Sequence, residues 1–172
     1  MEPVTIREVQ PEDLAEVARL NELAFDSAVE GQLVTLLHQR GKAVISLAAV
    51  AEGRIVGHVL FSPVSFSPSQ PQIRALGLAP LAVLPECQNQ GIGTQLSFEG
   101  LRRSLDGGWQ VVVVLGHPNY YPRFGFRPAS VIGLGNEYGA DEAFMAIELE
   151  PGILKGIKAV ACYGPEFKET GV

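Results

Sequence analysis

The stretch from Gln88 to Leu96, QNQGIGTQL, places two glycines one residue apart directly before a helix-like run. Glycine weakens a helix by about 0.5–1 kcal/mol relative to alanine, so the pair needs a compensating role. The first turn of a helix has backbone N–H groups without internal partners, and the helix dipole adds positive charge there. Gly91 and Gly93 therefore predict a site where a phosphate group approaches the backbone.

The spacing of these glycines does not match two familiar phosphate loops. Ser97, and no glycine, stands near the end of the GxGxxG pattern, and the GxxxxGK pattern is absent. A GxG turn between a strand and a helix also has a structural interpretation, in which the missing side chains let the helix pack closely on the strand. The residue types alone leave both interpretations open.

Patterns along the rest of the chain predict the elements that position this turn. Strands are expected at 4–9, 44–51, 54–65, 73–84, 109–115, 142–149 and 157–163, and helices at 11–20, 28–40 and 91–105. The order β-α-α-β-β-β-α-β-(short α)-β-β indicates a mixed α/β sheet with helices packed on it. The run 73–84 contains Gly77 and Pro80, so we expect a bulge, or a parting from the next strand, near Ala79–Leu81.

In this context the glycine turn resembles the acetyl-coenzyme A signature of the GCN5-related N-acetyltransferase (GNAT) family, a strand followed by Q/R-x-x-G-x-G/A. Gln88 stands at the first position, where arginine is commoner, and Gly91 and Gly93 follow. A second stretch, GHPNYYPRFGFRPA, resembles the family's Tyr-x-x-x-Gly-Phe segment after the fifth strand, in the subgroup with a YYxRFGF signature. The predicted element order also agrees, so the resemblance covers nearly the whole chain.

The resemblance implies an α/β (α+β) fold with one N-acetyltransferase domain over residues 1–172. Its mixed, mostly antiparallel sheet would have splayed fourth and fifth strands and flanking helices. The implied reaction moves the acetyl group of acetyl-CoA to an acceptor amine by direct attack in a ternary complex, without a metal. The pantetheine arm would enter the gap between the splayed strands and pair with the fourth, as an added strand does.

The same resemblance implies the cofactor contacts. The pantetheine arm is expected at the backbone of Leu81, Ala82 and Val83, and the pyrophosphate at the N–H groups of Gln88, Asn89, Gln90, Gly91, Ile92, Gly93 and Thr94. Further contacts are expected at Asn119, Tyr121 and Phe124. Backbone Leu81, or the residues before it, would also donate to the thioester carbonyl as charge develops there.

Tyr121 is the expected general acid for the leaving thiolate, because the family often uses a tyrosine at this place. A tyrosine hydroxyl, with an ordinary pKa of about 10, is a good donor at neutral pH. Tyr120 is the alternative, and Tyr121 also has an interpretation as packing beneath the cofactor.

The general base is less defined, because the run 73–84 contains no Asp or Glu. Glu30 is one candidate, although Ser27 to Glu30 also match a capping box. His117 is another, since its pKa range suits a base, and it also has an interpretation as a loop histidine. His58, within a strand, is expected to be a packed or surface residue. A water relay, or an acceptor that arrives neutral, would need no protein base.

Composition limits the partners. The net charge of −6 shows no basic excess, so no nucleic-acid partner is expected. The N-terminus lacks a signal-peptide pattern, no apolar run suggests a membrane span, and Cys87 and Cys162 fit reduced thiols, so we expect a cytoplasmic protein.

The sequence does not identify the acceptor amine, and no stretch predicts the homodimer that is frequent in the family. An acyl-CoA-binding regulatory module with little transferase activity is the alternative function.

Overall fold

The computed structural model describes residues 2–172. Its helices are α1 (Leu14–Phe25), α2 (Ala28–Gln39), α3 (Ile92–Asp106), α4 (Ala129–Ile132) and α5 (Pro165–Thr170). Its strands are β1 (Thr5–Glu8), β2 (Ile45–Ala51), β3 (Arg54–Ser67), β4 (Ala75–Val83), β5 (Val111–Leu115), β6 (Arg127–Pro128), β7 (Leu134–Asn136), β8 (Phe144–Glu148) and β9 (Ala159–Cys162). The predicted order is confirmed, and β6, β7, α4 and α5 are additional.

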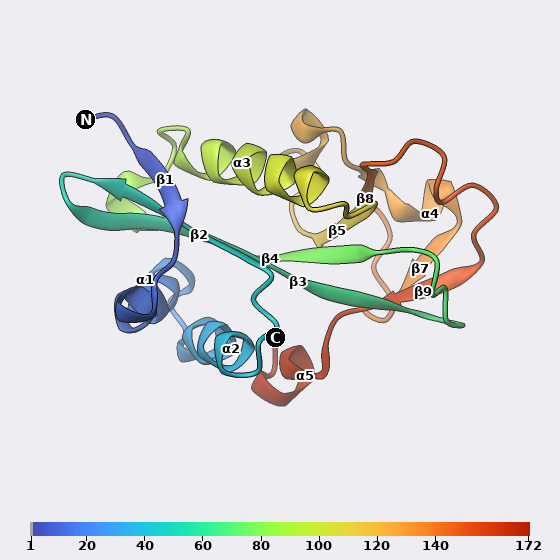
Figure 1. Ribbon diagram of the computed structural model, residues 1–172, viewed down its shortest axis with the longest axis horizontal. Helices are drawn as coiled ribbons and strands as arrows, with labels where there is room; N and C mark the ends of the chain where they lie inside the picture. Colours follow the sequence, from blue (N-terminus) through green and yellow to red (C-terminus); the bar gives the residue numbers. More distant parts are fainter. Residues whose placement is uncertain (1) are drawn as a thin grey trace.

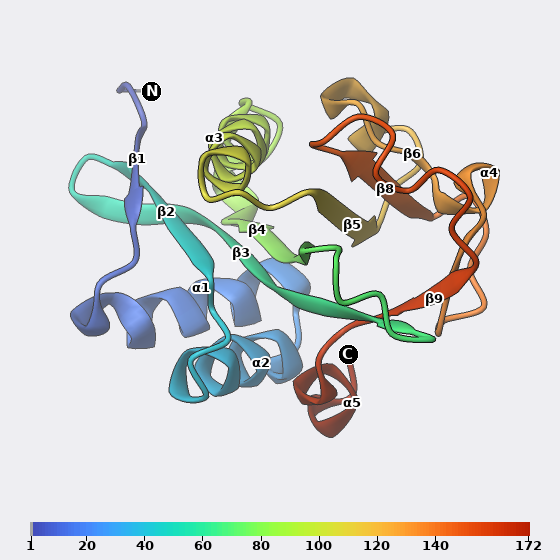
Figure 2. The same ribbon diagram turned by 45° about the vertical axis from the view of Figure 1, so that its right-hand side comes forward.

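A mixed sheet forms the centre of the molecule. Its strands follow the order β1-β2-β3-β4-β5-β8-β6, and β9 pairs with both β3 and β7. The pairs are antiparallel except for β4 with β5 and β7 with β9. Helix α3 lies on one face of the sheet, and α1, α2 and α5 lie on the other (Figures 1 and 2). The expected fold, a mostly antiparallel sheet flanked by helices, is confirmed.

Strands β4 and β5 part within the sheet. They pair only over Ala75–Gly77 and Val111–Val113. Against β3, the β4 register slips between Leu78 and Leu81, which adds one residue to β4. Both the predicted bulge and the predicted splay are confirmed. Beyond Gly77, the edge of β4 that faces β5 has no strand partner within residues 2–172.

Some local predictions need correction. Ser27 caps α2, because its Oγ accepts a hydrogen bond from the Val29 N–H at 3.2 Å. Its own N–H, however, donates to the Glu22 carbonyl at 3.1 Å, so the predicted reciprocal bond with Glu30 is wrong. The first helix has a 3₁₀ turn at Pro11–Asp13 before α1. The elements that were missed are short, and a tertiary partner stabilises each of them more than a local pattern does.

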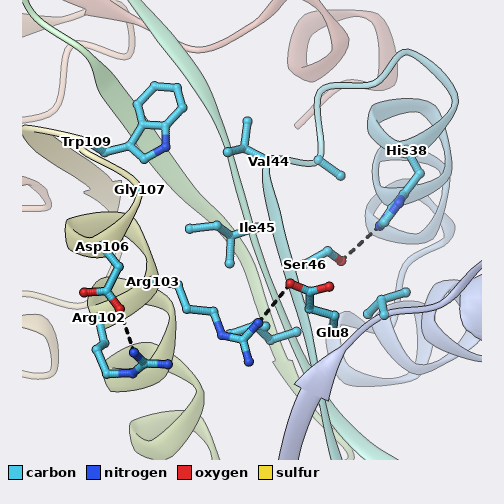
Figure 3. Close-up of a pocket in the computed structure, with 13 residues that line it drawn as sticks. Glu8, His38, Val44, Ile45, Ser46, Arg102, Arg103, Asp106, Gly107 and Trp109 are labelled. Carbon is cyan, nitrogen blue, oxygen red and sulfur yellow. Dashed lines mark hydrogen bonds and ion pairs between the residues drawn. The ribbon is translucent and has the colours of Figure 1, made fainter.

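A chain of polar side chains connects α1 to α2 along the face of the sheet that these helices cover (Figure 1). Asn21 Nδ2 donates to the Val17 carbonyl at 2.9 Å and lies 3.1 Å from His58 Nδ1. His58 Nε2 is 2.9 Å from Ser46 Oγ. The same Ser46 oxygen is 3.0 Å from His38 Nε2, a contact drawn in Figure 3. Because the Asn21 amide nitrogen is a donor, His58 Nδ1 accepts and its proton resides on Nε2. His58 is fully buried, which confirms its interpretation as a packed residue.

The buried histidine makes stability depend on pH. Burial lowers the pKa of His58 from 6.5 to about 3, so below pH 6.5 the unfolded chain binds a proton that the folded chain excludes. We expect the free energy of unfolding to fall by about 2 kcal/mol between about pH 7.5 and pH 5. Urea unfolding across this range measures the change. His58→Gln should make the profile less steep, with the remaining slope supplied by His38, whose pKa burial also lowers, and the exposed His117→Gln should retain the full slope. An equally steep profile in His58→Gln would contradict the assignment.

Candidate active site

The glycine turn forms an uncapped helix N-terminus. Gly91 is the N-cap of α3 with φ of 84°, a left-handed conformation that favours glycine. No side chain caps the helix, and its first turn contains no acidic residue. The first bond back to the cap runs from the Gln95 N–H to the Gly91 carbonyl at 3.0 Å. Ile92, Gly93 and Thr94 come before Gln95, the first residue that donates such a bond, so their N–H groups remain available to an anion.

The preceding loop adds to this anion site. Asn89 also has positive φ, at 61°, so two residues near the helix start turn their backbone in the left-handed sense. Because Asn89 and Gly91 have positive φ and Gln90 between them does not, the successive N–H groups form a concave nest. Gln88 Nε2 donates to the Val83 carbonyl at 3.1 Å, which ties the loop to the end of β4. No atom lies within 4 Å of where a Gly91 Cβ would be, so the loop opens into free space.

That space is a cavity of about 600 Å³. It is lined by Leu81, Val83, Cys87, Gln88, Asn89, Gly91, Ile92, Gly93, Thr94, His117, Tyr120, Tyr121 and Arg123. Most of the predicted cofactor contacts thus come together. Four do not line it: Ala82, Gln90, Asn119 and Phe124. Ala82 pairs with His58 of β3, and Phe124 lies under the Tyr120 ring with 5.4 Å between centroids.

The two neighbouring tyrosines occupy different places. The Tyr120 hydroxyl lies 3.3 Å from Thr94 Oγ1, at the first turn of α3. Tyr121 is 7% exposed, and its ring fills the position where a Gly116 Cβ would lie, directly after β5. Burial raises the pKa of Tyr121, so its hydroxyl remains protonated at neutral pH.

Arg123 and Cys87 are lining residues that the sequence interpretation missed. The Arg123 guanidinium lies 4.3 Å from the centroid of the Tyr120 ring, and its Nε donates to the Tyr120 carbonyl at 2.8 Å. It thereby brings a cation to the cavity that contains the uncapped helix terminus. The arginine in the YYPRFGF stretch was a usable signal, whereas nothing local marked Cys87. Both cysteines are free thiols.

The two candidate bases lie in different surroundings. His117 lines the cavity and is exposed. Glu30 lies in the first turn of α2, outside the cavity lining. One carboxylate oxygen of Glu30 is buried without a hydrogen-bond partner within the described part of the chain.

A second cavity, of about 620 Å³, lies at the other end of α3 (Figure 3). Its wall includes Trp109 and the ion pairs Arg103–Glu8, at 3.0 Å, and Arg102–Asp106, at 2.7 Å. Its arginines are already paired with carboxylates, and it contains the C-terminal end of α3, which disfavours anions. We therefore place the candidate active site at the cavity beside the N-terminus of α3.

No helix in residues 2–172 is both long and apolar enough to span a membrane. No group of three His, Cys, Asp or Glu side chains there is arranged to hold a metal ion.

The strand, the uncapped glycine turn and the parted sheet define an acetyltransferase of the GNAT class. The chain belongs to this family: the model of the acetyltransferase (GNAT) domain matches residues 5–129. The protein is accordingly an N-acetyltransferase, as its relatives are. YhbS of Escherichia coli strain K12, an uncharacterized N-acetyltransferase, is 34% identical over 164 residues, which cover 94% of this chain and 97% of YhbS.

Two solved structures are similar over almost the full length. A crystal structure of YhbS from Escherichia coli in complex with CoA has a TM-score of 0.89 at 32% identity, covering 98% of this chain and 95% of that one. A GNAT family acetyltransferase from Brucella melitensis in complex with acetyl-CoA has a TM-score of 0.81 at 30% identity, covering 97% and 99%.

Proposed function

We propose that residues 1–172 form one N-acetyltransferase domain that moves the acetyl group of acetyl-CoA to an acceptor amine by direct attack in a ternary complex. The single observation that carries this proposal is the uncapped N-terminus of α3 opening into the cavity beside the parted edge of β4. The CoA and acetyl-CoA complexes of the two similar structures support acetyl-CoA as the cosubstrate.

The chain offers a matching group for each part of acetyl-CoA. The amides of Ile92, Gly93 and Thr94 face a pyrophosphate, and Arg123 supplies a cation beside it. The edge of β4 at Leu81 through Val83 offers backbone groups to the pantetheine amides. Gln88 to Gly91 complete the loop around the phosphates. Asn119 and Phe124, which lie outside the lining, stay predicted cofactor contacts.

In the reaction, a C–N bond forms between the amine and the acetyl carbon while the C–S bond to CoA breaks. Backbone N–H groups near Leu81 stabilise the oxyanion that develops on the carbonyl. Tyr121 donates its hydroxyl proton to the leaving thiolate. The amine loses one proton as the amide forms, so the reaction as a whole neither releases nor takes up a proton. Because burial raises the pKa of Tyr121, the phenol is protonated at neutral pH and can donate a hydrogen bond to the thiolate as it forms.

Glu30 and His117 remain the candidates for the base that accepts the amine proton. Each has one structural argument: His117 lines the cavity, whereas Glu30 lacks the capping bond that competed for its carboxylate and has one buried oxygen without a partner among residues 2–172. The pH profile of kcat/KM distinguishes them. Only the variant that removes the base, Glu30→Gln or His117→Gln, should lose the limb that reports its ionisation.

A screen of amines tests the function directly. We expect purified protein to release free CoA thiol from acetyl-CoA when small amines, lysine-containing peptides and peptide N-termini are offered in turn. Thiol detection measures turnover, and mass spectrometry locates the added acetyl group. Tight binding of acetyl-CoA without release for any acceptor would favour the regulatory-module alternative. No binding at all would contradict the proposed cosubstrate.

A further inference from the structure

Tyr163 lies at the point where β4 and β5 part. Its hydroxyl oxygen is 3.2 Å from the carbonyl oxygen of Val113 in β5 and 3.4 Å from that of Leu78 in β4. Val113 ends the paired segment of β5, and Leu78 is the first residue of β4 beyond it. The hydroxyl hydrogen is therefore shared between one carbonyl of each strand.

The ring of Tyr163 enters from the face of the sheet opposite α3. It occupies the space that a Cβ at Gly77 would take. Gly77 pairs with Ser62 of β3, so the two residues point to the same face of the sheet. Ser62 borders a cavity of about 50 Å³ together with Leu37 of α2, which identifies this face as the one opposite α3. Leu81, by contrast, lines the large cavity on the α3 side. The tyrosine thus closes the gap between the strands from the side opposite the proposed cofactor site.

Neighbouring groups fix the position of this ring. Phe167 of α5 and Tyr138 pack against it, with 4.7 and 6.0 Å between ring centroids. The Tyr163 N–H donates to the Glu137 carboxylate at 3.1 Å, and Glu137 pairs with Lys168 at 3.2 Å. Strand β9, which leads into Tyr163, runs beside the end of β3 (Figure 2).

We propose that Tyr163 is a positioning residue that bridges β4 and β5 at a fixed separation and so sets the width of the gap for the pantetheine arm. This inference rests on the proposed function. Without the hydroxyl, the carbonyls of Leu78 and Val113 lose their shared donor, and the two strands are free to shift or to admit water. Burial raises the pKa of Tyr163, so the hydroxyl keeps its proton and acts as a donor.

The variant Tyr163→Phe tests the proposal, because it keeps the ring and removes only the hydroxyl. Binding is measured by calorimetry with acetyl-CoA and with adenosine 3′,5′-bisphosphate, which has the adenosine, the 3′-phosphate and the first 5′-phosphate of CoA but no pantetheine arm. We expect the affinity for acetyl-CoA to fall about tenfold, and the affinity for the bisphosphate to stay unchanged. Gly77→Ala, which displaces the ring, should produce the same selective loss.

Tyr138→Phe is the matched control, since it removes a hydroxyl from the same aromatic group without touching β4 or β5, and it should bind both ligands normally. Equal losses for both ligands in Tyr163→Phe would indicate general destabilisation and overturn the proposal. Unchanged affinity for acetyl-CoA would overturn it as well. A wild-type protein that does not bind acetyl-CoA would instead overturn the proposed function, and this inference with it.

Discussion

Gly91→Glu should abolish detectable binding of acetyl-CoA, with a loss of affinity of at least about 100-fold. The new carboxylate would lie at the N-cap of α3, where it accepts hydrogen bonds from the first-turn amides itself. It would also repel the pyrophosphate that those amides are proposed to hold. Calorimetric titration of acetyl-CoA into the purified variant measures the loss.

Gly152→Glu is the matched control for this experiment. Gly152 has the same φ of 84°, and no atom lies within 4 Å of its Cβ position, so the substitution introduces equal backbone strain and equal charge. It lies between β8 and β9, outside the cavity. We expect normal binding of acetyl-CoA by this variant. Normal binding by Gly91→Glu would place the phosphates elsewhere.

Tyr121→Phe should lower kcat about 100-fold while the dissociation constant of acetyl-CoA stays the same. The phenyl ring retains the packing against Gly116, so the cavity keeps its shape and only the proton donor is lost. Steady-state kinetics with an amine that the wild type acetylates gives kcat, and calorimetry gives the dissociation constant.

Tyr120→Phe provides the comparison, because the Tyr120 hydroxyl contacts Thr94 at the phosphate end of the cavity. We expect weaker binding of acetyl-CoA there, with kcat retained. If Tyr121→Phe retained full turnover, the ring would only pack beneath the cofactor, and the thiolate would take its proton from Tyr120 or from water. The two variants together thus separate binding from chemistry.

The sequence predicted those parts of the fold that depend on neighbours along the chain. The helix after Gly91 and the bulge near Pro80 both follow from local patterns, and both are confirmed. The glycine turn and the YYPRFGF stretch also indicated most of the residues that line the cavity, because each segment contributes several of them.

What the sequence could not predict depends on contacts between distant residues. Tyr163 reaches a carbonyl 85 positions away, and no pattern near residue 163 indicates this. Strand β7 has three residues and pairs with β9, so its stability comes from that partner rather than from its own periodicity. The capping box at Glu30 failed for the same reason, since the Ser27 N–H bonds to the end of α1.

The parted strands also bear on how the protein behaves at high concentration. Beyond Leu78, whose carbonyl accepts from Tyr163, the edge of β4 that faces β5 has no strand partner among residues 2–172, and such an edge is a template for strands of other molecules and hence for aggregation. Pro80, which has no N–H to donate, interrupts this edge and weakens it as a template. If acetyl-CoA pairs with the same backbone groups, it competes directly with self-association. The colloidal stability of this protein is then coupled to the concentration of its own cosubstrate.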